Sequence, residues 1–150
     1  MGKMNVPRII LGGVVAGILC FIGDGIIHGV LLRDRWAQVM ANLGRPVMQE
    51  QPIHMVYYAA YDLAKALVGV WLYAAIRPRF GPGGRTAVIA AVVTWALVIP
   101  IALLGLIPSA FFGRRFALLW SIDGLVVMVI AIVIGAWLYR EADAAPPAKT

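Results

Sequence analysis

Hydrophobic residues gather in four long runs, and short polar segments separate these runs. The runs cover approximately residues 9–32, 54–76, 86–107 and 116–139. Each is long enough to cross the roughly 30 Å of bilayer hydrocarbon at about 1.5 Å per helical residue. The pattern predicts an all-α fold, a four-transmembrane-helix antiparallel bundle, in a single membrane domain over residues 1–140. The last ten residues, 141–150, are rich in alanine and proline and are predicted to be disordered.

Composition supports a lipid environment. Of the 150 residues, 62% are hydrophobic and 13% are charged, whereas soluble domains carry about a quarter charged residues. The formal charge is +6, but the basic residues lie mostly between the apolar runs and form no stripe interleaved with aromatics. The expected partner is therefore the lipid bilayer, and nucleic acid is not expected.

The distribution of lysine and arginine predicts the orientation. The side that holds both termini and the second connection carries Lys3, Arg8, Arg77, Arg79, Arg85, Arg140 and Lys149. The other side carries Arg33, Arg35, Arg45, Arg114 and Arg115. Because cytoplasmic segments hold the excess of basic residues, we expect a multi-pass protein of the bacterial cytoplasmic membrane with both termini in the cytoplasm.

The first connection is the longest and begins with an amphipathic pattern. Trp36, Met40 and Leu43 follow an i, i+4, i+7 spacing, and Gly44 and Pro46 come directly afterwards. This predicts a short helix lying on the outer membrane surface, with tryptophan at the interface. The helix could be an anchor or a lid over a site beneath it.

A five-residue pattern occurs twice. Gly69–Tyr73 reads GVWLY and Gly135–Tyr139 reads GAWLY. The two copies could be a relic of duplicated helical hairpins, but their flanking residues do not align. Independent anchoring by aromatic residues at the cytoplasmic interface is the interpretation we favour.

Five ionisable residues fall inside the predicted spans: Asp24, His28, Asp62, Lys65 and Asp123. The three carboxylates lie at similar distances from the non-cytoplasmic ends of their spans, roughly 12–14 Å below that surface. We therefore expect one layer of aspartates, with His28 above it and Lys65 below it.

Helical spacing places these residues on faces that turn towards other helices. The stripe on the first span comprises Gly13, Gly17, Cys20, Asp24 and His28, and that on the second comprises Tyr58, Asp62, Lys65, Gly69 and Tyr73. Small and polar residues of this kind face neighbouring helices. The predicted ligand- or ion-binding residues are Asp24, His28, Asp62, Lys65, Asp123 and Tyr58.

The charges of these buried residues do not balance. Three carboxylates and one ammonium, with His28 neutral, leave two negative charges uncompensated, each costing at least ~3 kcal/mol in the membrane. A protonated carboxylate, a charged His28, water or a bound cation could offset them. Asp24 and His28, one turn apart, could share a proton or jointly hold a metal, and Asp62 and Lys65 could pair. The sequence thus predicts a buried acidic site that binds or passes a small cation, proton or polar ligand.

Several alternatives remain at the sequence level. The charged pairs could hold helices together, in a non-catalytic accessory or scaffolding subunit of a larger membrane complex. The spacings Gly13-x-x-x-Gly17 and Gly25-x-x-x-Gly29 offer one close-packing surface inside the bundle and one for a homo-oligomer or partner. A lipid-modifying membrane enzyme is a weaker alternative, and an enzyme is disfavoured because no nucleophile elbow, P-loop or metalloprotease motif occurs.

No cofactor is predicted, and the question stays open. A zinc or iron site is disfavoured because His28 is the one good soft ligand in the cluster. Haem or chlorophyll on His28 or His54 is disfavoured because the two are poorly placed as a pair.

The segment Gly23–Gly44, GDGIIHGVLLRDRWAQVMANLG, carries a resemblance. With Trp36, Met40 and the Leu43-Gly44 pair, it resembles a family of small bacterial four-helix integral membrane proteins of unknown function. The layout of four helices and a long first connection extends the similarity over most of the chain. The resemblance implies a bacterial cytoplasmic-membrane protein and no particular activity.

Overall fold

The structure, a computed structural model, describes residues 4–46, 51–111 and 113–140, and the predicted disorder of 141–150 lies outside them. Helices make up most of the described chain, which contains no strand, so the prediction of an all-α fold is confirmed. The elements are α1 (Val6–Ile26), the π-helix η1 (Ile27–Leu31), α2 (Arg33–Asn42), α3 (Pro52–Phe80), α4 (Gly84–Val98), α5 (Pro100–Leu106), the 3-10 helix η2 (Ile107–Ser109) and α6 (Arg114–Trp137).

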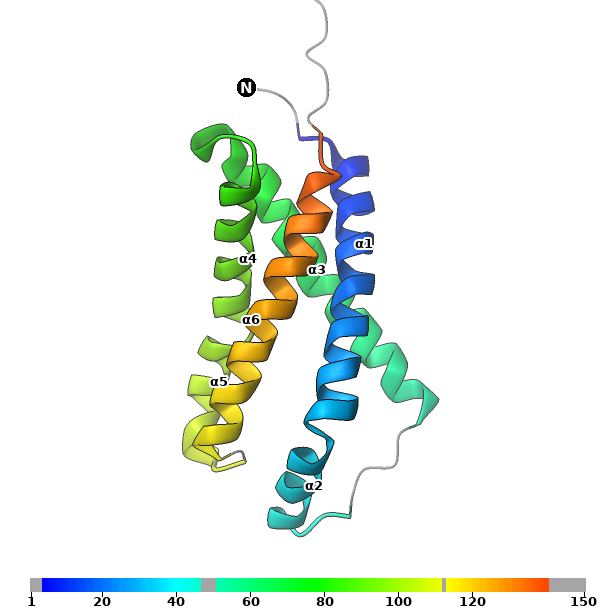
Figure 1. Ribbon diagram of the computed structural model, residues 1–150, viewed down its shortest axis with the longest axis vertical. Coiled ribbons are helices and arrows are strands. Elements are labelled where there is room, and N and C mark those ends of the chain that lie inside the picture. The colour runs from blue at the N-terminus through cyan, green and yellow to red at the C-terminus, as the bar shows by residue number, and fades with distance from the viewer. Residues whose placement is uncertain (1–3, 47–50, 112, 141–150) are drawn as a thin grey trace, which may run out of the picture.

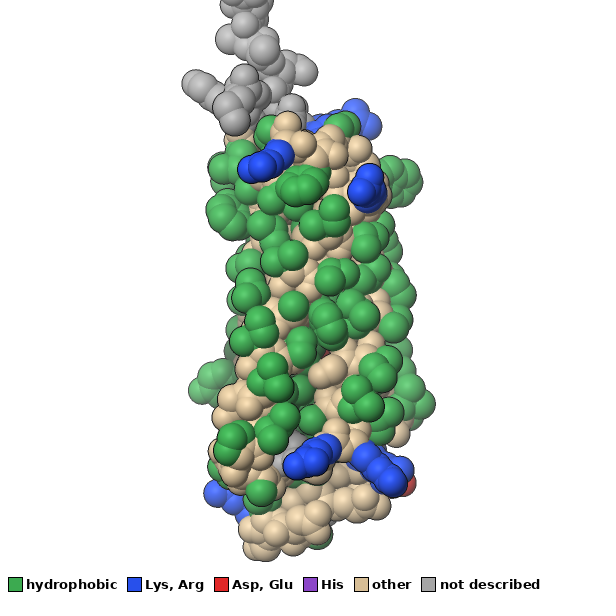
Figure 2. All heavy atoms as spheres, turned by 90° about the vertical axis from the view of Figure 1, so that its left-hand side faces the viewer, with side chains coloured by type: hydrophobic (Ala, Val, Ile, Leu, Met, Phe, Trp, Pro, Cys, Tyr) green, Lys and Arg blue, Asp and Glu red, His purple; other side chains and the backbone are tan. Residues whose placement is uncertain are grey.

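Four helical segments of the described chain are long and apolar enough to cross a membrane. They are Val6–Leu31, Pro52–Phe80, Gly84–Ser109 and Arg114–Trp137, and each contains most of one predicted run. On the face seen in Figure 2, hydrophobic side chains cover the middle of the molecule and basic side chains gather at its two ends. The outer surface is thus apolar where lipid tails would lie.

The long helices lie alongside one another. Helix α1 packs against α3 and α6, and α4 packs against the same two helices. Figure 1 shows the start of α1, the end of α6 and the α3–α4 connection at one end of the molecule, with α2 and α5 towards the other. The first turns of α3 extend sideways, away from α4, α5 and α6.

Glycines on α1 bring the helices close together. A Cβ atom on Gly12 would lie 2.3 Å from the carbonyl oxygen of Gly135 on α6. On the neighbouring face, a Cβ on Gly13 or Gly17 would lie 2.3 or 2.9 Å from Leu67 or Leu63 of α3. The predicted inward role of Gly13-x-x-x-Gly17 is confirmed, and no side chain could be added without moving the helices apart.

Two helix boundaries differ from the predicted ones near proline. Helix α3 continues through Pro78 to Phe80, four residues beyond the expected end, and stops at Gly81, whose φ is 82°. The proline removes one hydrogen bond near the helix end, and glycine then allows the left-handed backbone. The third span is interrupted at Ile99, between α4 and α5, since Pro100 cannot continue the α4 hydrogen-bond pattern.

The repeated glycine–tryptophan–tyrosine pattern has the same structural role in both copies. The hydroxyl of Tyr73 accepts a hydrogen bond from the N–H of Gly83, directly before α4, and that of Tyr139 accepts one from Asn5, directly before α1 (both 3.3 Å). The two buried rings meet edge to face at 6.0 Å. These tyrosines therefore fix the starts of helices. The tryptophans of the two copies, Trp71 and Trp137, are instead exposed, by 49% and 85%.

Candidate functional site

Three of the predicted site residues meet between α1 and α3. The ammonium of Lys65 donates a hydrogen bond to Asp24 Oδ2, across the helix interface. It also lies 2.7 Å from Asp62 Oδ1, one turn earlier on its own helix. The expected Asp62–Lys65 pair is therefore present, and Lys65 joins carboxylates from two helices.

Burial makes this ionic cluster sensitive to its charge balance. Asp62 and Lys65 are almost fully buried, while the side chain of Asp24 keeps 20% of its surface exposed. Lys65 also lies over the ring of Tyr61, with its nitrogen 5.0 Å from the ring centroid. The ring face supplies electron density on a third side of the ammonium. With two carboxylates and one ammonium, the cluster carries one excess negative charge when all three groups are ionised.

His28 is not held by the ionic cluster but by tryptophan. It lies on the π-helix η1, and its Nδ1 accepts a hydrogen bond from Trp36 Nε1 at 3.2 Å. A nitrogen that accepts a hydrogen bond carries no proton, so this imidazole is the neutral form with its proton on Nε2. His28 therefore does not supply the positive charge that the aspartates lack.

An aromatic cluster joins η1, α2 and α6 around this histidine. The rings of Trp36 and Phe116 meet edge to face at 4.9 Å, those of Trp36 and Trp120 at 5.4 Å, and those of His28 and Trp120 at 5.6 Å. These separations are typical of favourable aromatic pairs. Helix α2 is thus attached to the rest of the protein through Trp36, and Val39 is its buried residue.

Asp123 sits apart from the hydrogen bonds of the ionic cluster. Its Oδ1 accepts from the backbone N–H of Gly124 at 2.7 Å. Its Oδ2 is buried and has no hydrogen-bond partner within the described chain. A buried carboxylate oxygen without a donor is costly when ionised, so Asp123 is the described carboxylate most in need of a proton or cation.

Two further predictions concern Tyr58 as a site residue and a metal held by Asp24 and His28. Tyr58 lies one turn before Asp62 but is 41% exposed, so its place in a binding site remains a prediction. The idea that Asp24 and His28 jointly hold a metal gains no support, because Asp24 bonds to Lys65 and His28 to Trp36. The described residues contain no group of three histidine, cysteine or acidic side chains that could hold a metal ion.

Sequence reasoning missed the aromatic partners of the site. Tyr61 is one turn before Lys65, at the i, i+4 spacing that brings side chains together, and this signal could have identified it. The meeting of Trp36 with Trp120 had no such local signal, since the two are far apart in sequence and their contact depends on how α2 folds back.

Replacing Trp36 with alanine is expected to release α2 from the rest of the protein. The cost should stay below the about 3–5 kcal/mol of a fully buried tryptophan, because Trp36 is half-buried. Hydrogen–deuterium exchange of Arg33–Asn42 should become faster, with little change in α3. Trp36→Phe, which keeps a ring, should show a smaller effect. Unchanged exchange in Trp36→Ala would show that the aromatic cluster does not hold α2.

Comparisons of the chain with protein-family models, curated proteins and solved structures gave no match. The assignment of a function therefore depends on the chemistry of the residues described above. That chemistry is an internal ion cluster with excess negative charge, a neutral histidine nearby and a further buried carboxylate on α6.

Proposed function

We propose that this is a multi-pass protein of the bacterial cytoplasmic membrane, with four antiparallel spans and both termini in the cytoplasm. The four long apolar helices and the basic side chains at both ends of the apolar surface support a membrane-spanning arrangement. The excess of lysine and arginine on the side of the two termini supports the orientation. Helix α2 would then lie near the outer interface, where half-buried Trp36 suits the boundary between lipid and water.

We further propose that the acidic site binds or passes a proton or small cation. The observation that carries this proposal is the shortage of positive charge. Lys65 forms ion pairs with both Asp24 and Asp62, and His28 is neutral. An uncompensated charge inside a membrane is costly, so a cation that neutralises it is bound favourably. Asp24 is the partly exposed carboxylate of the cluster and is therefore the position where an incoming cation would arrive.

A flux measurement tests this proposal. Purified protein reconstituted in liposomes should dissipate an imposed proton, Na⁺ or K⁺ gradient faster than protein-free liposomes do. Asp24→Asn should abolish the excess flux, because it removes the accessible charge, while the protein still inserts and folds. The matched control is Asp34→Asn, which removes the same charge from the exposed start of α2 and should leave the flux unchanged. Equal flux in wild type, Asp24→Asn and protein-free liposomes would contradict the proposal.

A second candidate is a non-catalytic accessory subunit of a larger membrane complex. The first turns of α3 favour it, because neighbouring residues such as Val56 and Tyr57 are both exposed and the segment extends away from the other helices. Gly25 and Gly29 face open space, where another helix could approach closely. This candidate is supported if the protein co-purifies with a defined partner and Asp24→Asn mainly lowers its abundance.

A further inference from the structure

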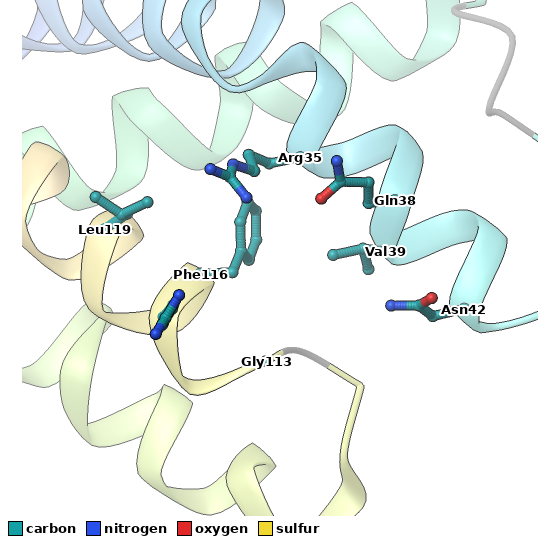
Figure 3. A pocket seen from close by; sticks show the side chains of 8 residues that line it. Arg35, Gln38, Val39, Asn42, Gly113, Phe116 and Leu119 are labelled. Carbon is teal, nitrogen blue, oxygen red and sulfur yellow. The ribbon is translucent and has the colours of Figure 1, made fainter.

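A pocket of about 250 Å³ lies between α2 and the first turns of α6, outside the ionic cluster (Figure 3). Helix α2 contributes Arg35, Gln38, Val39 and Asn42, and the start of α6 contributes Gly113, Arg115, Phe116 and Leu119. Figure 3 shows Gln38, Val39 and Asn42 projecting from α2 towards the side of the pocket formed by α6. Two separate helices therefore build its walls.

The polar part of this pocket has the chemistry of an anion site. Arg35 and Arg115 bring one guanidinium from each helix, and neither has a carboxylate partner within the described residues. A guanidinium offers paired N–H donors whose geometry matches phosphate oxygens. Side-chain amides of Gln38 and Asn42 add neutral donors on the α2 side.

The start of α6 strengthens the same preference. Helix α6 begins after Gly113, which lines the pocket, and no side chain of the described chain caps its first N–H groups. The N-terminal end of a 24-residue helix carries partial positive charge and unpaired donors, and both favour an anion.

The rest of the lining is apolar. Val39, Phe116 and Leu119 complete the pocket, and the two α6 residues share one face of the helix at i, i+3 spacing. A free inorganic anion gains no binding energy from contact with apolar side chains. A phospholipid does, because its phosphate lies directly above hydrocarbon chains. Basic pockets between membrane helices recognise anionic lipid headgroups in this way.

We propose that this pocket binds the phosphate of an anionic phospholipid, with the acyl chains following the apolar surface of α6. The pocket lies where the apolar helix α6 begins, at the end of the molecule that holds α2. A lipid held there would join α2 to α6, which the aromatic cluster already connects through Trp36 and Phe116.

Lipid retention by the purified full-length protein tests the proposal. Native mass spectrometry in detergent, with added phosphatidylglycerol, should show bound lipid on the wild type. The double variant R35Q/R115Q should bind at least about tenfold more weakly, because charge-assisted hydrogen bonds are lost at both arginines. The matched control is R33Q/R114Q, which removes the same charge from the same two helices at positions that do not line the pocket. It should bind within about threefold of the wild type.

Two outcomes would overturn the proposal. Equal weakening in R35Q/R115Q and R33Q/R114Q would show general attraction to a basic surface instead of a specific pocket. Binding of inorganic phosphate as tight as that of phosphatidylglycerol, with competition between the two, would show that the ligand is a soluble phosphate. Phosphatidylcholine serves as the neutral-headgroup comparison and should bind more weakly than phosphatidylglycerol.

Discussion

Replacing Lys65 with methionine is expected to destabilise the protein by about 3–5 kcal/mol, because the change leaves two carboxylates without their shared ammonium. Asp62 is almost fully buried and Asp24 is mostly buried, so water cannot compensate fully for the lost charge. Methionine fills a similar volume, so the effect comes from charge rather than from a cavity. Unfolding by increasing denaturing detergent in mixed micelles measures the loss.

Two companion variants separate charge balance from packing. Lys65→Arg keeps the positive charge and should retain more stability than Lys65→Met. The triple variant D24N/D62N/K65M removes all three charges together and should recover much of the stability, since a buried ion network can often be replaced without a large loss. Wild-type stability in Lys65→Met alone would contradict a structural ion cluster. A stable triple variant without ion flux would separate the functional role of the charges from their role in folding.

Replacing Gly12 with valine is expected to cost about 3 kcal/mol, at the upper end of the range for overpacked positions. A Cβ atom at this position would meet the carbonyl oxygen of Gly135 at 2.3 Å, and a backbone oxygen cannot move aside as the end of a side chain can. The helices α1 and α6 would have to separate near the start of α1. Thermal unfolding of the detergent-solubilised protein measures the cost.

Gly25→Val provides the matched control on the same helix. Apart from the neighbouring backbone of its own helix, no atom of the described chain lies within 4 Å of a Cβ atom at Gly25, so this variant should stay within about 0.5 kcal/mol of the wild type, as exposed substitutions usually do. Equal effects of the two substitutions would mean that valine acts through helix propensity and not through the α1–α6 contact.

Much of the polar arrangement follows from local spacing and is therefore visible in the sequence. Asp62 and Lys65 are one turn apart on one helix, and their pairing follows from helical geometry alone. The stripe of small and polar residues on the first span also predicts correctly which face of α1 is turned inward: Gly13, Gly17 and Cys20 are all buried. Long apolar runs likewise predict the helices, because only internal hydrogen bonding can satisfy a backbone in lipid.

The contacts between helices are decided by tertiary packing. Sequence spacing predicts three aspartates at one depth, but it does not predict which of them form ion pairs with Lys65. The close approach of α1 to α3 at Gly13 and Gly17 brings Asp24 to Lys65, whereas Asp123 bonds within its own helix.

The sequence by itself determined that the chain forms four long apolar helices with charged residues inside them, because helix formation and burial depend on local periodicity. Only the tertiary structure decided that His28 accepts from Trp36, that α2 packs on α6 and that two arginines share a pocket. These features depend on how far helices rotate and tilt, and that is set by close contacts between residues distant in sequence.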